Sequence, residues 1–478
     1  MEILNYIDGK FCPADSGKVL QNVSPANGEV FSTLPASAKS DVAKAYQAAK
    51  KAFPIWSKMS KGKRSKMLLS ISQEIENQLD ELAKAESQDN GKPLSLAKAV
   101  DIPRAAKNMA FFATAILHDH QEAYDMDGHA INYTQRKPLG VVGCISPWNL
   151  PLYLFTWKIA PALASGNCVI AKPSELTPLT AFLFAKICKK VGLPDGVLNI
   201  VHGLGNEVGQ AIVEHPDIPA ISFTGGTVTG AHISKITGPM FKKTSLELGG
   251  KNPVIIFDDC DFDKMIAGVV KSSFANQGQI CLCGSRIYVQ KSIYKRFLDE
   301  FVDRVSKLKV AHPSDADSDI GALVSKAHLE KVKSYIQIAK DEGGAVACGG
   351  NQVHPKGFEN GFYLEPTVIT GLETCSRTNQ EEIFGPVVSV IPFEDENLVL
   401  EEANNSKYGL SAVLWTQNLT RAHHFAHELD TGIVWVNTWL MRDLRTPFGG
   451  AKQSGLGREG GFEALHFFTE EKTICIRI

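Results

Sequence analysis

The feature of this 478-residue sequence that most constrains its fold is an alternation that starts at Leu139. Short apolar runs rich in β-branched residues alternate there with segments of helical periodicity. Strands that alternate with helices form a mostly parallel sheet covered by helices, so we predict an α/β fold. The predicted strands are 140–145, 167–171, 197–201, 220–223, 244–248 and 253–257, then 286–290, 345–348, 367–369, 387–393, 412–415 and 433–437.

The rest of the chain divides into helical and strand-like parts. Residues 40–118 show helical periodicity, with Asp41 as the cap of a first helix and 61–86 as a second. A chain of this length exceeds one hydrophobic core, so we expect two or three domains with a boundary near residue 250. Residues 121–135 and 467–478 are strand-like pieces outside both alternations. Such extensions usually pair with a sheet or helix of another subunit, and a simple edge strand is the alternative.

Composition excludes several classes of partner. Lys and Arg number 50 and Asp and Glu 52, a net charge of -2, so no field of one sign recruits nucleic acid or an anionic membrane. The sequence starts without a basic and apolar leader, and no apolar run reaches membrane-spanning length. The ten cysteines are irregularly spaced, which favours a reducing compartment. We therefore expect a soluble, cytoplasmic protein.

Two residues suggest chemistry on a carbonyl group. Cys281 is framed by small and polar residues in the run 274–286, and Glu247 stands in the Gly-rich run 246–253. A thiol can serve as a covalent nucleophile, and a carboxylate in an apolar turn can activate water. Most cysteines in such proteins are only small buried hydrophobes, so these two runs alone leave both readings open.

Four further segments add possible binding functions. Asn149, in 146–151 after a strand, offers a neutral amide donor for an oxyanion. Glu175, in 171–175, can accept hydrogen bonds from ribose hydroxyls. The turn 223–230 leads from a strand through glycines into a helix, a place that suits a phosphate, although it lacks the G-x-G-x-x-G pattern. The fourth segment is 381–386, followed at a distance by 447–457.

In this order and spacing the segments resemble the NAD(P)-dependent aldehyde dehydrogenase superfamily over essentially the whole chain. The resemblance implies a Rossmann-type cofactor domain from residues 1–118 and 138–249 and an α/β catalytic domain from residues 250–450. A small β oligomerisation extension would consist of residues 119–137 and 465–478. It further implies a homo-oligomer, either a dimer or a tetramer.

The resemblance also implies residue roles. Cys281 would attack the aldehyde, Asn149 would hold the oxyanion, and Glu247 would activate water for hydrolysis of the thioester. The carboxylate of Glu175 would repel a 2′-phosphate, so NAD is the expected cofactor. Many members carry Ser where this chain has Gly226, which removes one hydroxyl near the phosphate. The implied cofactor contacts are Ile145, Trp148, Lys172, Glu175, Phe223, Gly225, Gly226, Leu248, Glu382 and Phe384.

The expected substrate follows from arginines at family channel positions. Arg104 and Arg442 match such positions, together with Leu150 and Trp157, whereas Arg445 is as well explained as a surface residue. Desolvated guanidinium groups need an anion, and a carboxylate fits them best. The stretch 439–445 resembles the 2-aminomuconic and 2-hydroxymuconic semialdehyde dehydrogenases. Succinic or glutaric semialdehyde and broad-specificity enzymes are alternatives, and a betaine aldehyde is disfavoured because arginines repel its ammonium.

Other readings are less favoured. A thiol hydrolase would also use Cys281, but it needs a histidine base, and no histidine stands in a recognisable active-site motif. A catalytically silent homologue is disfavoured because every expected catalytic position is filled. We expect no metal: His423 and His427 lack the glutamate of an H-E-x-x-H motif, and Cys283, a neighbour that could form a disulfide with Cys281, has no second cysteine pair nearby.

Overall fold

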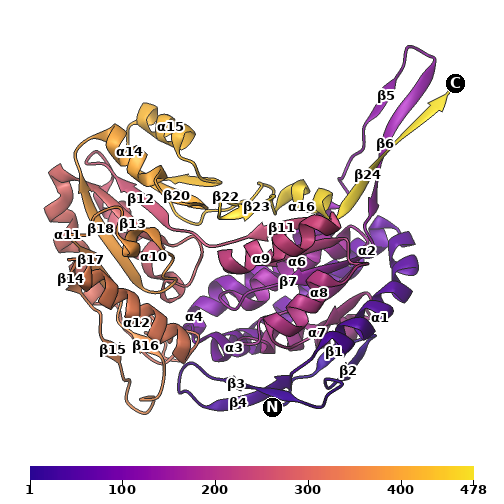
Figure 1. Cartoon of the computed structure of the whole chain (residues 1–478), viewed down its shortest axis with the longest axis horizontal. Coiled ribbons are helices and arrows are strands. Elements are labelled where there is room, and N and C mark those ends of the chain that lie inside the picture. Colours follow the sequence, from indigo (N-terminus) through magenta and orange to yellow (C-terminus); the bar gives the residue numbers. More distant parts are fainter.

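The computed structural model describes residues 1–478 and is built on two large sheets (Figure 1). The first contains β1 (Asn5–Ile7), β2 (Lys10–Cys12), β7 (Val141–Ile145), β8 (Cys168–Lys172), β9 (Leu198–Ile200), β10 (Ala220–Thr224), β11 (Lys243–Glu247) and β23 (Gly455–Leu456). Their order is β2-β1-β9-β8-β7-β10-β11-β23. The central run from β9 to β11 is parallel, so the carboxyl ends of these strands lie along one edge.

Helices of the first half of the chain cover this sheet. They are α1 (Lys39–Lys58), α2 (Lys61–Asn77), α3 (Leu79–Asn90), α4 (Leu94–Leu96), the π-helix η1 (Ala97–Asp101), α5 (Ile102–Ala115), α6 (Pro151–Ala164), α7 (Leu179–Val191), the π-helix η2 (Gly205–Gly209), α8 (Gln210–Glu214), α9 (Thr227–Thr237) and the 3₁₀ turn η3 (Gly238–Met240). The late helix α16 (Gly461–Phe467) returns to pack against α6. Most of the apolar side chains of both sheets share one large core.

The second sheet contains β12 (Asn252–Ile256), β13 (Gly284–Gln290), β14 (Ala345–Cys348), β17 (Thr367–Thr370), β18 (Val387–Phe393), β20 (Ser411–Trp415) and β21 (Ile433–Val436). Its order is β14-β17-β18-β13-β12-β20-β21, and only β14 is antiparallel to its neighbour. Its helices are α10 (Phe262–Phe274), the 3₁₀ turn η4 (Ala275–Gly278), α11 (Lys291–Ser306), α12 (Lys326–Asp341), α13 (Arg377–Gln380), α14 (Glu396–Asn404) and α15 (Leu419–Glu428).

Smaller sheets complete the molecule. Two-stranded ones pair β3 (Val19–Val23) with β4 (Val30–Pro35), β15 (Gln352–Val353) with β16 (Tyr363–Leu364), and β19 (Tyr408–Gly409) with β22 (Ala451–Lys452). A three-stranded sheet of β5 (Ala123–Asp125), β6 (Ala130–Pro138) and β24 (Thr469–Arg477) projects from the body as an arm (Figure 1). None of the helices combines the length and the apolar character needed to cross a membrane.

The α/β prediction is confirmed, and every predicted strand of the two alternations lies within two residues of an observed one. Three details differ. The first helix begins at Lys39, and Asp41 lies inside its first turn, where its carboxylate accepts a hydrogen bond from the Ala38 N–H at 2.9 Å. The predicted helix 61–86 is divided at Gln78 into α2 and α3. The strands β1 to β4 and the two-residue strands β15, β16, β19, β22 and β23 were not predicted, because each is short.

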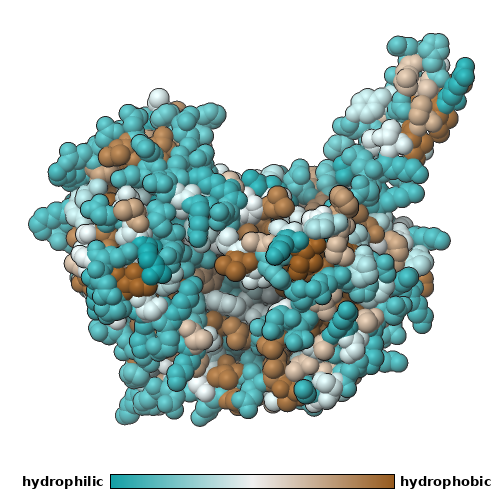
Figure 2. Space-filling model, in the orientation of Figure 1, coloured by the Kyte–Doolittle hydropathy of each residue, from teal (hydrophilic) through white to brown (hydrophobic).

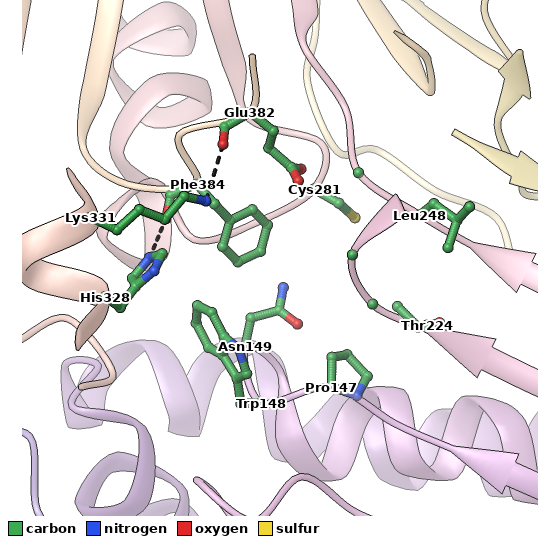
Figure 3. A pocket seen from close by; sticks show the side chains of 13 residues that line it. Pro147, Trp148, Asn149, Thr224, Leu248, Cys281, His328, Lys331, Glu382 and Phe384 are labelled. Carbon is green, nitrogen blue, oxygen red and sulfur yellow. Dashed lines mark hydrogen bonds between the residues drawn. The ribbon is translucent and has the colours of Figure 1, made fainter. Parts of the chain in front are cut away.

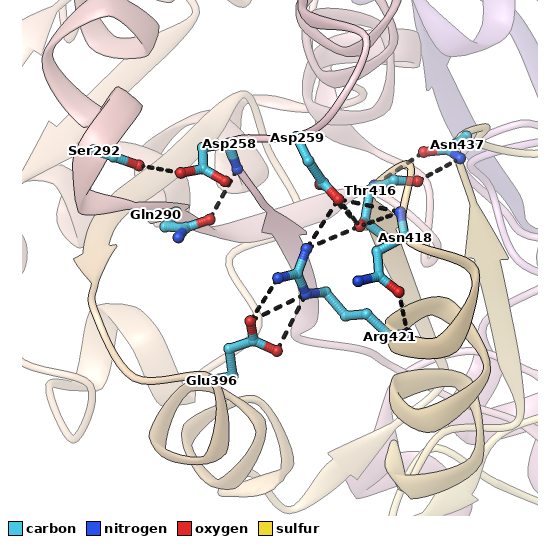
Figure 4. A network of polar contacts seen from close by, with 9 residues as sticks. All are labelled: Asp258, Asp259, Gln290, Ser292, Glu396, Thr416, Asn418, Arg421 and Asn437. Atoms are coloured by element: carbon cyan, nitrogen blue, oxygen red, sulfur yellow. Dashed lines mark hydrogen bonds and ion pairs between the residues drawn. The ribbon is translucent and has the colours of Figure 1, made fainter.

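A polar network shows how the second sheet is fixed at the carboxyl end of its strands (Figure 4). Arg421, on α15, pairs with Asp259, which follows β12, at 3.0 Å, and with Glu396, at the start of α14, at 2.6 Å. Its guanidinium carbon lies 4.1 Å from the ring centre of Phe257. Since these contacts occupy that edge with protein groups, the open edge for a ligand is the one facing the first sheet.

Candidate active site

A cavity of about 260 Å³ lies between the two sheets, in the hollow visible between the two lobes in Figure 2. It opens at the carboxyl ends of β7, β10 and β11 and is closed from the other side by α12 and the segment around Glu382. The chain crosses from the first sheet to the second at Gly249 and Gly250, beside this cavity. The residues that line it are Pro147, Trp148, Asn149, Thr224, Gly225, Gly226, Leu248, Gly249, Cys281, His328, Lys331, Glu382 and Phe384 (Figure 3).

The half-buried Cys281 stands in the loop between η4 and β13. Its main-chain carbonyl accepts a hydrogen bond from Asn252 Nδ2 at 2.7 Å, which fixes the loop. Burial raises the pKa of the thiol well above its ordinary value; the carboxyl of Glu247 raises it further, and Arg442 opposes the shift. These effects favour the thiol over the thiolate in the free enzyme, and Cys281 lines the cavity.

The Asn149 amide lies on the opposite wall of the same cavity (Figure 3). The side chain is buried, and its Nδ2 donates to the carbonyl of Gln279 at 2.9 Å. That bond ties it to the loop that carries Cys281. A neutral donor fixed across the cavity from the thiol can face negative charge on an oxygen that lies between them.

Glu247, the last residue of β11, is buried, and neither of its carboxylate oxygens has a hydrogen-bond partner. Burial raises its pKa well above the ordinary value, the nearby carboxyl of Glu459 adds to the shift, and Lys158 and Arg442 oppose it. An unpartnered carboxylate with a raised pKa is suited to take a proton from water.

An aromatic cluster forms one end of the cavity. The ring centre of Trp148 lies 5.2 Å from that of Phe384 and 5.1 Å from that of His328, in edge-on arrangements. Glu382 beside them accepts a hydrogen bond from the Gly250 N–H at 2.9 Å. His328 and Lys331 are lining residues that the sequence did not reveal. Their i,i+3 spacing on α12 was the available signal, and it is too common to identify a site.

His328 does not supply the base that a thiol hydrolase needs. Its Nε2 contacts the carbonyl oxygen of Phe384 at 2.7 Å, so this nitrogen is the donor. Burial lowers the pKa of the ring to about 4, with a small opposing effect from that carbonyl. Cys283 does not line the cavity, and its sulfur lies 3.8 Å from the carbonyl oxygen of Ala275.

The Gly-rich turn faces the cavity at the start of α9. This helix begins after Gly226 without a side-chain cap, so its first N–H groups are free for an anion. The hydroxyl of Thr224 is buried there with no partner. A Cβ on Gly225 would lie 2.4 Å from the ring of Phe223, whereas the space beside Gly226 is open, so the missing serine side chain leaves room.

Four predicted cofactor contacts lie outside the lining of this cavity. Ile145 and Phe223 are buried at the ends of β7 and β10. Lys172 ends β8, and its Nζ pairs with Glu175 Oε2 at 3.0 Å. The Glu175 side chain is 31% exposed, which leaves it open to a ligand at this edge of the sheet. The other six contacts, Trp148, Gly225, Gly226, Leu248, Glu382 and Phe384, all line the cavity.

The structure brings Arg104 and Arg442 together. Arg104, on α5, has its guanidinium carbon 5.3 Å from the ring centre of Tyr153 and 5.8 Å from that of Trp157. Arg442 lies 5.1 Å from the Trp157 ring and donates to the Tyr153 hydroxyl at 3.2 Å. One guanidinium nitrogen of each arginine is buried without a partner, as is Trp157 Nε1. Leu150 is buried at the start of α6, directly after Asn149.

Burial lowers the pKa of Arg104, and the neighbouring positive charge of Arg442 lowers it further. The exposed Arg445 differs from this pair because it forms an ion pair with Asp443 at 2.6 Å. Arg445 is therefore a surface arginine, whereas Arg104 and Arg442 are not.

Comparison with known proteins agrees with this geometry. The sequence profile of the Aldehyde dehydrogenase family matches residues 11–474. The chain is 51% identical to the 2-aminomuconic semialdehyde dehydrogenase of Homo sapiens, over 99% of this chain and 98% of the relative. It is 46% identical to the 2-hydroxymuconic semialdehyde dehydrogenase of Pseudomonas sp. (strain CF600), with both chains fully covered.

A solved structure also has a similar fold. The NAD⁺ complex of an aldehyde dehydrogenase from Bacillus cereus superposes with a TM-score of 0.98 at 39% identity, covering 100% of this chain and 97% of that chain. The matched family agrees with the features of the site, which are the thiol of Cys281, the amide of Asn149, the carboxylate of Glu247 and the uncapped start of α9. The chain therefore belongs to the aldehyde dehydrogenase family and is an NAD-dependent oxidoreductase that acts on aldehydes.

Proposed function

We propose that the substrate is an aldehyde that also bears a carboxylate, of the muconic semialdehyde type, and that the product is the corresponding diacid. The observation that carries the proposal is the pair Arg104 and Arg442, each with a buried unpartnered nitrogen. Two adjacent, partly buried cations are costly without an anion between them. A carboxylate satisfies both, and the named relatives that oxidise 2-aminomuconic and 2-hydroxymuconic semialdehydes support this choice.

The catalytic roles are assigned to Cys281 and Asn149, which line the cavity, and to the buried Glu247, which precedes the lining residue Leu248 at the end of β11. The thiol of Cys281 first loses its proton to solvent, the thiolate sulfur then adds to the aldehyde carbon, and the carbonyl oxygen takes the π-electron pair and becomes an alkoxide. Asn149 Nδ2 and the main-chain N–H of Cys281 donate to that oxygen, with about 3–4 kcal/mol of stabilisation from each well-placed donor. When bound, NAD supplies the hydride acceptor that allows a thioester to form.

Glu247 serves the second half of the reaction. Its free carboxylate removes a proton from water, and the resulting hydroxide adds to the thioester carbon. The carbon–sulfur bond then breaks, which releases the acid and returns the thiolate of Cys281. Because neither buried oxygen of Glu247 has a hydrogen-bond partner within the protein, each can accept a hydrogen bond from a water that enters the site.

Chain groups at the edge of the first sheet would hold NAD. The free hydroxyl of Thr224 and the first turn of α9 suit the pyrophosphate, and Glu175 suits ribose hydroxyls. Trp148, Glu382, Phe384 and Leu248, which line the cavity, would hold the nicotinamide end. Ile145 and Phe223 support the strand ends, and Lys172 orients Glu175 through their ion pair.

The proposed division into parts is a cofactor domain (1–118 and 138–249), a catalytic domain (250–450) and an oligomerisation element (119–137 and 465–478). The arm supports a homo-oligomer. Tyr124, Met126, Ile131, Ile476 and Ile478 are all more than two-fifths exposed on it, and apolar colour follows it in Figure 2. All ten cysteines are unpaired, which supports a cytoplasmic location.

The test is NADH formation, followed by absorbance, with a matched panel of aldehydes. We expect 2-hydroxymuconic semialdehyde to be oxidised with a much higher kcat/KM than hexanal. Arg104 and Arg442 together are called the substrate clamp. Succinic and glutaric semialdehydes test whether binding at this clamp requires the longer, unsaturated carbon chain. Equal efficiency with hexanal would reject the carboxylate-bearing substrate.

A further inference from the structure

We propose that Lys92 and Asp101 form a buried positioning pair that fixes Asn149 in the geometry its donor role requires. The inference rests on the proposed function, because it gives Asn149 the oxyanion. Neither residue lines the cavity, and neither touches a reacting atom. They lie behind the wall that carries Asn149.

Lys92 contacts Asn149 directly. Its Nζ donates to the main-chain carbonyl of Asn149 at 3.0 Å and pairs with the Asp101 carboxylate. Both side chains are 0% exposed. Buried charges are costly unless they are paired and hydrogen-bonded. Holding the Asn149 carbonyl with a buried ion pair therefore costs more stability than holding it with a contact at the surface.

Neighbouring groups fix the same short loop. Asn90 Nδ2 donates to the carbonyl of Trp148 at 2.9 Å, and the carboxylate of Glu86 accepts from the Leu152 N–H at 3.3 Å. Both come from α3, on the same side as Lys92. The loop between β7 and α6, which has no side-chain cap of its own at α6, is thus fixed from behind by groups from one segment.

The front of the loop is tied to the nucleophile. Asn276 Nδ2 donates to the carbonyl of Asn149 at 3.0 Å, and the Asn149 side chain donates to the carbonyl of Gln279 at 2.9 Å. The carbonyl of Asn149 therefore lies between Lys92 behind and Asn276 in front. If Lys92 is removed, this carbonyl keeps its hydrogen bonds from Asn276 Nδ2 at 3.0 Å and Asn90 Nδ2 at 3.4 Å but loses its charged donor, so the peptide is held less firmly and the Asn149 amide is oriented less precisely.

Asp101 extends the connection to the substrate clamp. It is the last residue of the π-helix η1, and α5, which carries Arg104, begins at the next residue. A π-helix inside a helical segment is frequently found at a functional site. The ion pair therefore joins the oxyanion donor to the helix that carries one clamp arginine.

The size of the effect follows from how steeply catalysis depends on donor placement. Misplacement by about 1 Å costs on the order of a hundredfold in rate. We expect the rate constant for the first NADH to fall about tenfold to a hundredfold when the pair is replaced. The reactivity of Cys281 toward iodoacetamide, which needs no oxyanion donor, is expected to stay unchanged.

The variant to use is Lys92→Met combined with Asp101→Leu. It removes the two paired charges together, so neither is left without its partner, and the buried Glu86 nearby keeps its hydrogen bond from the Leu152 N–H. Asp101→Asn alone keeps the side-chain volume at this position. It is the second variant, for use if the double variant does not fold. Single-turnover NADH formation from hexanal is measured in each, in the full-length chain and again in an Asn149→Ala background.

If the pair acts through Asn149, its replacement slows acylation in the parent and adds little in the Asn149→Ala background. Equal slowing in both backgrounds, or no slowing in the parent, overturns the inference. If Asn149→Ala itself leaves acylation unchanged, the oxyanion assignment of the proposed function fails, and the inference fails with it. If only Asn149→Ala slows acylation, the inference alone fails.

Discussion

Arg104 and Arg442 place two guanidinium groups against one ring, with their carbons 5.8 and 5.1 Å from the ring centre of Trp157. They come from α5 and from a loop after β21, more than 300 residues apart in sequence. Each has a neighbouring aromatic face and a buried nitrogen without a partner. The ring contacts offset part of the desolvation, and the free nitrogens remain available for a carboxylate.

Replacing either arginine by alanine is therefore expected to raise KM for 2-hydroxymuconic semialdehyde by about tenfold or more, since a charge-assisted hydrogen bond contributes about 1.5–3 kcal/mol. The effect on hexanal is expected to be small. Arg445→Ala is the matched control, because Arg445 is exposed and paired with Asp443. Equal losses on both substrates, or an equal loss in the control, would contradict the clamp. Steady-state NADH assays measure all of these.

The nucleophile assignment separates two cysteines that are two residues apart. We expect Cys281→Ser to abolish NADH formation and Cys283→Ala to keep most of it, because only Cys281 lines the cavity. The buried sulfur of Cys283 contacts the carbonyl of Ala275, so its loss removes packing and no reacting group. Comparable losses of activity in folded samples of both variants would disprove the assignment.

Local pattern was enough to predict most of the fold. The strands of both sheets were predicted because β-branched apolar runs bounded by turns are distinctive. The N-terminal strands β1 to β4 were missed, since strands of only three to six residues carry little periodicity. The break at Gln78 was missed because the apolar spacing continues across it.

The site was harder to predict where it depends on distant contacts. Cys281, Glu247 and Asn149 were marked by their runs, but the pairing of Arg104 with Arg442 is created by tertiary structure alone. His328 and Lys331 stand on an ordinary amphipathic helix, and Lys92 and Asp101 look like surface charges in sequence. Only the fold shows that Lys92 and Asp101 are buried behind Asn149.

The role of Glu247 predicts a split between the two half-reactions. In Glu247→Gln the first NADH is expected to form, since addition of the thiol does not need this carboxylate, while later turnover slows because water is not activated. Rapid mixing would show a burst of about one NADH per active site followed by a slow phase. An unchanged steady-state rate would remove Glu247 from the mechanism.

Cofactor choice is predicted from Glu175. Its carboxylate, held by Lys172 at 3.0 Å, favours ribose hydroxyls and repels a 2′-phosphate, so NAD is expected to be preferred over NADP. Glu175→Gln is expected to narrow the preference, mainly through a lower KM for NADP, because the repulsion disappears. The ratio of kcat/KM for the two cofactors measures this. Equal efficiency in the unmodified enzyme would contradict the placement.

The last prediction concerns the protonation of Cys281 in the free enzyme. Burial and then the carboxyl of Glu247 raise the pKa of the thiol, and Arg442 lowers it. The thiolate fraction is therefore expected to rise with pH from neutrality to at least about pH 9 without a plateau. Iodoacetamide, a neutral reagent, reports this fraction through the rate of alkylation.

Two variants are expected to shift the pH profile of alkylation in opposite directions. Glu247→Gln removes a nearby negative charge, lowers the pKa of the thiol, and shifts the alkylation profile to lower pH. Arg442→Met removes a positive charge and shifts the profile to higher pH. Because the pKa of Glu247 is itself raised, the first shift is expected only at pH values where that carboxyl is ionised in the parent. Superimposable profiles for the three proteins, or shifts of the reverse sign, would show that these charges do not act on the sulfur.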